Sequence, residues 1–233
     1  DGYPMGPVEK DYLLAVIKRF AAIYFCDILG FCLMGNHFHL LVRMQPESAV
    51  SNEDVVERYQ AVYGKQDDIP LAAQTQFITS YKQKWTSLSN LIAEIKQTFS
   101  RNYNKRHDRK GFFWGGRFKS VIVEDGRTLV NCLAYIDLNP IRAGIIEKPE
   151  EYRWSSLGYH LGSGNAEGLL STDFGMSEWC DASASERLRM YREYVYRTGA
   201  VDTGKGKPLD QRVLERAESK HFKYSLSDRF AMR

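Results

Sequence analysis

The feature that most constrains the fold is a pair of strand-like segments around residue 35. The segment 27–34 and the segment 37–42 both have the apolar composition of β-strands. Gly35 and Asn36, which lie between them, are typical turn residues. The two segments therefore predict a β-hairpin, and the chain on either side of it carries helical patterns.

Two of these helices are predicted from the spacing of apolar residues. The first covers 8–23, and the second follows the region 45–86, which is polar and poorly patterned and is interpreted as an insertion or long excursion. Ser87 or Ser89 could cap the second helix, which should end near His107. The apolar stripe of this second helix consists of Leu88, Ile92, Ile95, Phe99 and Tyr103.

A further strand and a further helix are predicted next. The segment 118–123 is rich in β-branched and aromatic residues, which favours a strand. Asp125 is a plausible N-cap for a helix that runs to about Leu138, and Pro140 should end that helix.

The order helix, hairpin, helix, strand, helix predicts an α+β fold of ferredoxin-like type, an antiparallel sheet with helices packed on it. We assign this domain to residues 1–160, with the insertion at about 45–86. Residues 161–185 are interpreted as a loop or linker because the segment is rich in Gly and Ser. Residues 186–233 are predicted to form a helical C-terminal appendage.

Cysteine usage and hydropathy exclude several classes of protein. The four cysteines are scattered and form no CxxC pair, which argues against a structural zinc site and a disulfide scaffold. No apolar run is long enough to span a bilayer, and the first four residues have no signal-peptide pattern. These features favour a cytoplasmic protein without a membrane partner.

Positive charge is concentrated in one part of the chain. The formal net charge is only +3, but the segment 101–119 holds seven basic residues and one acidic residue, Asp108. Phe112, Phe113 and Trp114 are embedded in it. Cations for phosphates and flat rings for bases are what single-stranded DNA binding requires. A solvated basic helix end followed by core aromatics is the competing interpretation.

Two histidines stand a strand repeat apart in the second strand of the hairpin. Because side chains alternate between the faces of a strand, His37 and His39 should point the same way. Neutral imidazoles so placed can share one divalent cation. Two histidines on a half-exposed strand without a metal are the alternative.

A polar stripe is predicted on the helix after Asp125. Asn131, Tyr135 and Asn139 are spaced four residues apart, on an otherwise apolar helix. A tyrosine flanked by asparagines at this edge is placed to act in a cleft. A tyrosine with a buried ring and a hydrogen-bonded hydroxyl is the alternative.

Five stretches of the sequence, in order over about residues 9–160, resemble the single-tyrosine HUH transposases, and more closely the REP-associated tyrosine transposases. The first is the segment 30–42, which contains Gly-Asn-His-Phe-His. The others are Ile95-Lys-Gln-Thr-Phe99, Trp114-Gly-Gly-Arg-Phe-Lys119, Tyr135-Ile-Asp-Leu-Asn-Pro-Ile-Arg-Ala-Gly144 and Tyr152-Arg-Trp-Ser-Ser156. The resemblance implies the HUH nuclease fold.

The resemblance also implies roles for individual residues. His37 and His39 would bind a divalent metal, Mg²⁺ or Mn²⁺, and Asn139 would complete its ligands. The family's nucleophile precedes the Asn-Pro pair, which corresponds to Tyr135. Tyr103 and Tyr152 are the other candidates, but Tyr103 lies on an apolar stripe and Tyr152 belongs to a stretch whose aromatics should pack.

The implied activity is cleavage and rejoining of single-stranded DNA through a 5′-phosphotyrosine intermediate, at repeat hairpins. The protein would act as a monomer or homodimer in a bacterial cytoplasm, on the nucleoid. The residues expected to contact DNA are Arg101, Lys105, Arg106, Arg109, Lys110, Trp114, Arg117 and Lys119.

Two departures from the family and two rival functions stay open. Relatives have a strand before the first helix, which only Asp1–Pro7 precedes here, and the segment 228–233 ends abruptly, which suggests truncation. One rival is a non-catalytic regulator that binds DNA hairpins. The other is a metal-dependent hydrolase with a different substrate, which the basic run and the lack of a carboxylate near the histidines disfavour.

Overall fold

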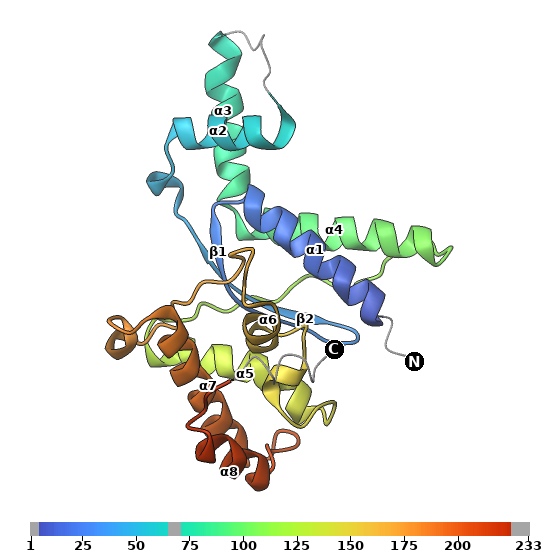
Figure 1. Cartoon of the computed structure of the whole chain (residues 1–233). Coiled ribbons are helices and arrows are strands. Elements are labelled where there is room, and N and C mark those ends of the chain that lie inside the picture. The colour runs from blue at the N-terminus through green and yellow to red at the C-terminus, as the bar shows by residue number, and fades with distance from the viewer. Residues whose placement is uncertain (1–4, 65–70, 225–233) are drawn as a thin grey trace. The chain divides into compact units, whose positions relative to one another are not determined.

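The computed structural model describes residues 5–64 and 71–224 and confirms the α+β class, with a helical extension after the sheet (Figure 1). Strands β1 (Cys26–Leu33) and β2 (Phe38–Met44) form a two-stranded antiparallel sheet. The helices are α1 (Pro7–Ile23), α2 (Asn52–Tyr63), α3 (Leu71–Trp85), α4 (Leu88–Arg106), α5 (Arg127–Arg142), α6 (Ser156–Ser163), α7 (Ala184–Ala200) and α8 (Gln211–Ser219). Short 3-10 helices lie at Glu47–Ala49, Pro149–Glu151 and Ser177–Trp179. The segments 1–4 and 228–233 lie outside the described residues.

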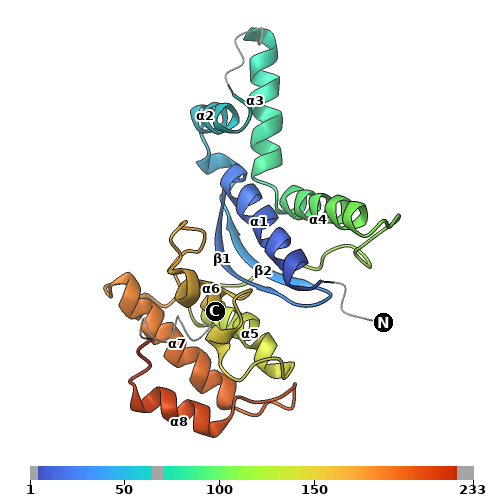
Figure 2. The ribbon, with the colours of Figure 1, turned by 45° about the vertical axis from the view of Figure 1, so that its right-hand side comes forward.

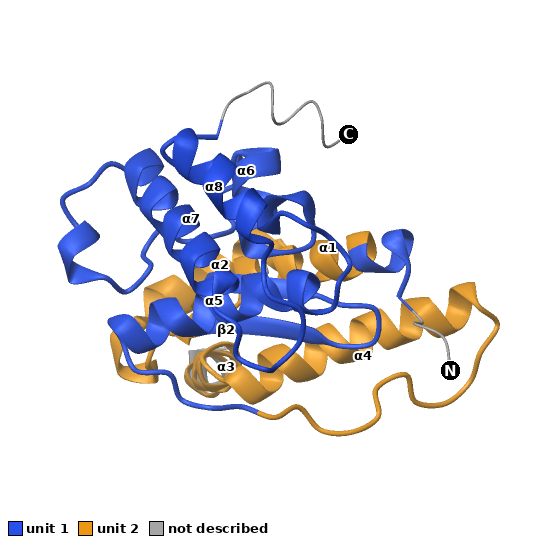
Figure 3. Ribbon diagram, turned by 90° about the horizontal axis from the view of Figure 1, so that it is seen from below, with its two compact units in different colours: residues 1–10, 28–42, 120–233 blue, residues 11–27, 43–119 orange. Residues whose placement is uncertain are grey.

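The chain divides into two compact units (Figure 3). The first unit comprises residues 1–10, 28–42 and 120–233, and the second unit comprises 11–27 and 43–119. The hairpin turn with the two histidines and the helices α5 to α8 therefore belong to the first unit. The domain boundaries predicted from the sequence stay a prediction.

In the first unit, β1 packs closely on α5 and α6. A side chain at Gly30 would lie 2.5 Å from the Leu133 side chain and 2.9 Å from the Ser156 hydroxyl, so only glycine allows this approach. Ser156 Oγ accepts a hydrogen bond from the Phe31 N–H at 2.7 Å. The Leu33 N–H donates to the Trp154 carbonyl at 2.9 Å. These contacts hold the strand against the helix that carries Tyr135.

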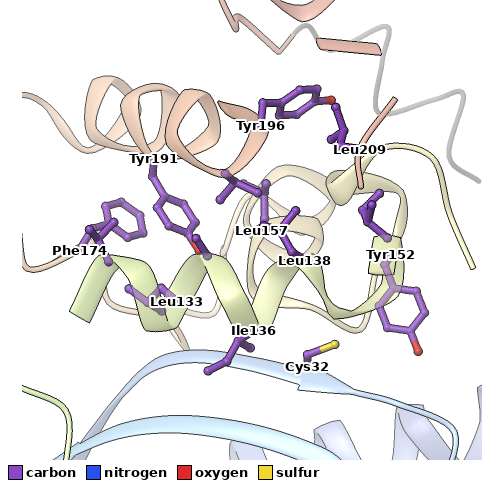
Figure 4. Packing of buried hydrophobic residues seen from close by; sticks show 14 of the residues in the cluster. Cys32, Leu133, Ile136, Leu138, Tyr152, Leu157, Phe174, Tyr191, Tyr196 and Leu209 are labelled. Carbon is purple, nitrogen blue, oxygen red and sulfur yellow. The ribbon is translucent and has the colours of Figure 1, made fainter. Parts of the chain in front are cut away.

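Helix α5 is also fixed from its other side, by α6 and α7. Asp137 is fully buried and accepts hydrogen bonds from the Tyr191 hydroxyl of α7 at 2.6 Å and from the Leu157 N–H at 3.0 Å. Tyr191 reaches from α7 towards α5, and its ring stacks on Phe174 at 4.4 Å (Figure 4). Because an unpaired buried carboxyl is costly, these bonds set the rotation of α5.

The second unit is built on aromatic contacts. Helix α2 packs against α3, as two views show (Figures 1 and 2). The Tyr59 ring lies 4.7 Å from Phe77 and 5.0 Å from Tyr81, and Trp85 is fully buried. Region 45–86 therefore contains a 15-residue helix, α3, which its weak sequence pattern did not predict.

The strand predicted over 118–123 is wrong. The segment has no regular structure, and Val121 and Ile122 are 82% and 100% exposed. A strand needs the backbone of a neighbour, and within the described residues only β1 and β2 form a ladder. β-Branched composition alone therefore did not produce a strand here.

The predicted ends of α5 also need correction. The N-cap is Gly126, whose positive φ of 74° suits glycine, and Asp125 bonds only to the Gly126 N–H. Pro140 lies inside the helix, which continues to Arg142. The amide nitrogen of Asn139 donates to the Ile136 carbonyl at 3.2 Å, the acceptor that the missing N–H of Pro140 would have used.

The buried His160 of α6 should make stability depend on pH. Burial lowers the pKa of His160 to about 4, from an ordinary value of 6.5, so the unfolded chain binds its proton first as the pH falls. The contribution of neutral His160 to the free energy of unfolding is therefore fully present above about pH 6.5 and is lost as the pH falls towards 4. We expect wild type to lose about 2 kcal/mol more than His160→Gln between pH 7 and pH 5 in urea unfolding.

This comparison with the variant is needed because Asp137 acts in the opposite direction. Burial raises the pKa of Asp137 to about 6, so its stabilising contribution is present at low pH and is lost as the pH rises through that value. The variant keeps Asp137, and the difference between the two proteins isolates His160. Equal losses in both proteins would contradict the assignment.

Candidate active site

The two histidines lie side by side at the start of β2, as their spacing predicted. Their ring centroids are 5.0 Å apart and the planes are nearly perpendicular, at 88°. His37 directly precedes the strand, and His39 lies within it. The Met34 N–H donates to the His37 carbonyl at 2.9 Å, so the closing pair of the hairpin fixes the backbone that carries both rings.

The surroundings of both imidazoles favour the neutral form, the form that binds metals. Burial lowers the pKa of His37, and burial together with the neighbouring charge of His37 lowers the pKa of His39. The neutral form of each ring is therefore favoured. His37 Nδ1 lies 2.7 Å from Asn36 Oδ1, an acceptor, so the proton belongs on Nδ1 and the lone pair on Nε2.

Tyr135 lies beside this pair. Its ring centroid is 6.2 Å from that of His39, and the side chain is 46% exposed. Its hydroxyl has no hydrogen-bond partner among the described residues, so the oxygen is available to a substrate. The Arg142 guanidinium lies 5.0 Å from the Tyr135 ring.

The rest of the polar stripe on α5 is anchored. Asn131 accepts a hydrogen bond from the Tyr194 hydroxyl of α7 at 2.5 Å. Asn139 donates its amide nitrogen to the carbonyls of Tyr135 and Ile136, at 3.0 and 3.2 Å. The described bonds of Asn139 therefore use only its nitrogen and leave its oxygen as an acceptor.

The competing tyrosines are buried. Tyr103 belongs to α4, and its ring centroid lies 4.5 Å from that of Phe113. The Tyr152 hydroxyl donates to the Leu33 carbonyl at 2.6 Å and accepts from Lys10 Nζ at 2.8 Å. Both side chains therefore have packing roles, and neither is exposed as Tyr135 is.

A divalent cation at this site would depend on few protein ligands. Within 5–64 and 71–224, no group of three or more His, Cys, Asp or Glu side chains could hold a metal ion. The candidate donors are the imidazoles of His37 and His39 and the side-chain oxygen of Asn139, which lies one helical turn after Tyr135. Imidazole nitrogens and an amide oxygen are donor types that divalent metals accept, and waters or substrate oxygens would have to supply the remaining ligands of a bound ion.

The predicted DNA-contacting cations lie in the second unit and are all exposed. None forms an ion pair with the residues that the structure describes. The group consists of Arg101, Lys105, Arg106, Arg109, Lys110, Arg117 and Lys119. Trp114 is half-buried, and its Nε1–H donates to the Lys96 carbonyl at 3.1 Å. Its ring therefore has a packing role on α4 and is also partly accessible.

Two residues of the site were not singled out by sequence reasoning. Arg142 is seven residues after Tyr135, so two helical turns place it on the same face, a signal that the sequence does contain. Asp137 gives no such signal, because its partners Tyr191 and Leu157 come from distant parts of the chain.

Comparison with known proteins gives two findings. The family model for IS200-like transposases matches residues 6–66, which include the histidine pair. The predicted resemblance is confirmed. A protein of Haemophilus influenzae named REP-associated tyrosine transposase is 28% identical over 154 residues, 63% of this chain and 72% of the relative. No solved structure matches the chain.

No helix among the described residues is long and apolar enough to cross a membrane.

Proposed function

We propose that the protein is a metal-dependent transposase that cleaves and rejoins single-stranded DNA, with Tyr135 as the nucleophile. The observation that carries the proposal is the exposed Tyr135 ring beside His39, within one compact unit. The similarity to IS200-like transposases supports the class of reaction. Repeat hairpins are the targets we propose, by analogy with the REP-associated relative.

The Tyr135 oxygen attacks the scissile phosphorus in line, and its proton leaves to solvent. The bond from phosphorus to the 3′ oxygen breaks, and that oxygen takes up a proton to become a 3′-hydroxyl. The 5′-phosphate stays on Tyr135. Attack by another 3′-hydroxyl reverses the step, so strands are joined without an external energy source.

His37, His39 and Asn139 would hold Mg²⁺ or Mn²⁺. An ion held there would offset charge on the phosphate oxygens. Arg142, beside the Tyr135 ring, would add a second positive charge for the phosphate. Exposed cations of the second unit would hold the DNA backbone.

A gel assay tests this proposal. The protein is incubated with a labelled single strand that carries a repeat hairpin, with Mn²⁺, with Mg²⁺ or with EDTA, and then run under denaturing conditions. The proposal expects a covalent adduct only with metal. Hairpin binding without an adduct in any metal would contradict it and would support the non-catalytic regulator instead.

His37→Ala should reduce adduct formation at limiting Mn²⁺ by at least about tenfold, because losing a direct ligand costs no less than losing an outer-shell partner. Excess Mn²⁺ should restore part of the activity. His221→Asn, which changes an exposed histidine outside the site, is the matched control. Unchanged activity of His37→Ala across a metal titration would remove His37 from the metal site.

A further inference from the structure

We infer that a groove on the second unit, between α4 and the segment 111–118, binds unpaired DNA bases. The groove has a volume of about 1060 Å³. Ile92, Ala93 and Lys96 of α4 line one side, and the segment 111–118 lines the other. This inference rests on the proposed function for the identity of the polymer, and it adds a place where bases, rather than phosphates, are held.

The groove is built in advance of any ligand. Three hydrogen bonds tie the segment 111–118 to α4: Lys96 Nζ donates to the Gly116 carbonyl at 2.6 Å, Trp114 Nε1–H to the Lys96 carbonyl at 3.1 Å, and Asn104 Nδ2 to the Gly111 carbonyl at 2.8 Å. A preformed wall avoids much of the ordering cost of binding. The groove is therefore a fixed feature of this unit.

Aromatic rings are presented at this groove in two ways. Phe113 and Trp114 pack on Phe99, with ring centroids 5.0 and 5.4 Å from it, so they form a rigid wall. Phe112 is 97% exposed and has no such packing. A ring this exposed contributes almost no burial to folding, so its apolar face is available, and a flat partner that stacks on it would remove that face from water.

The positive charge of this surface indicates which kind of molecule the groove binds. All seven cations of the segment 101–119 are exposed, and Arg117 lines the groove itself. An uncharged apolar peptide would use the rings and leave the positive charges unmatched, whereas a polyanion with flat side groups matches both properties. Bases inside a duplex are already stacked, so a single strand fits and a duplex does not.

The test separates bases from phosphates and from catalysis. The Tyr135→Phe protein in EDTA is titrated with a fluorescein-labelled dT single strand, an abasic strand of equal length, a duplex, and an RNA strand. We expect the dT strand to bind more tightly than the abasic strand by about fivefold or more. Because metal and nucleophile are absent, the result does not depend on whether the protein cleaves DNA.

Phe112→Ala in the same background should remove most of this difference and leave binding of the abasic strand unchanged. Its exposure means that the change should not affect folding. Tyr63→Ala, which removes another exposed ring of the second unit outside the groove, is the matched control. Equal binding of dT and abasic strands, an unaffected Phe112→Ala, preference for the duplex, or tighter binding of RNA would each overturn the inference.

Discussion

Tyr135→Phe should abolish the covalent adduct, with a loss of rate on the order of 10⁴-fold or more, because the variant lacks the attacking oxygen. The ring that lies against Arg142 and His39 is kept. The Tyr135 hydroxyl has no hydrogen-bond partner in the described part of the chain, so the stability of the variant should stay within about 0.5 kcal/mol of wild type.

Tyr103→Phe and Tyr152→Phe provide the comparison. Both tyrosines are buried, and Tyr152→Phe gives up two hydrogen bonds, so these variants are assayed well below their unfolding temperatures. Each should still form the adduct. An adduct that persists in Tyr135→Phe and disappears in either of the others would reassign the nucleophile.

Arg192→Ala should destabilise the first unit by about 3–5 kcal/mol, because it leaves a buried carboxylate without its counter-charge. Arg192 lies 2.6 Å from Glu150, and the two side chains are 8% and 4% exposed. The Tyr196 hydroxyl also donates to Glu150, at 2.9 Å. This buried group joins α7 to the turn that follows α5, so its loss should also weaken the Tyr191 contact to Asp137.

Arg197→Ala is the matched control on the same helix. Arg197 pairs with Glu193 at 3.0 Å and with Glu218 at 3.2 Å, but it is 57% exposed, so its removal should cost about 1 kcal/mol or less. Urea unfolding at pH 7 measures both variants. A loss for Arg192→Ala no larger than that for Arg197→Ala would show that the buried pair does not hold α7 in place.

Local signals predicted most of the regular structure. The turn residues Gly35 and Asn36 and the apolar segments around them gave the hairpin. Ser87 is the N-cap of α4, which ends at Arg106 with His107 as its C-cap, close to the predicted end. These features depend on residues close in sequence, where capping and periodicity act directly.

Features that depend on distant residues were not predicted correctly. The segment 118–123 has strand composition but no neighbouring strand within the described residues. The continuation of α5 past Pro140 was also missed, but for a local reason: the side chain of the neighbouring Asn139 donates to the carbonyl that Pro140 leaves without a donor. Helix α6 is held by hydrogen bonds between Ser156 and the backbone of Phe31 in β1. The short sequence of α6 contains no pattern that predicts these bonds.

The candidate site shows the same division between features with a local signal and features without one. Strand alternation placed His37 and His39 together, and helical spacing placed Tyr135 on a polar edge. Their proximity across the fold rested on the family resemblance alone, because no local pattern relates β2 to α5. The groove between α4 and the segment 111–118 could not be predicted from the sequence either. It depends on hydrogen bonds between residues of α4 and residues of this later segment.

The central claim is tested most directly by finding which residue carries the DNA. After reaction with the hairpin strand, the adduct is treated with nuclease and trypsin and analysed by tandem mass spectrometry. The tryptic peptide 128–142 contains Tyr135 as its single tyrosine, while Tyr103 and Tyr152 fall in other peptides. A nucleotide on peptide 128–142 is the predicted result. A nucleotide on a different tyrosine, or on none, would contradict the account.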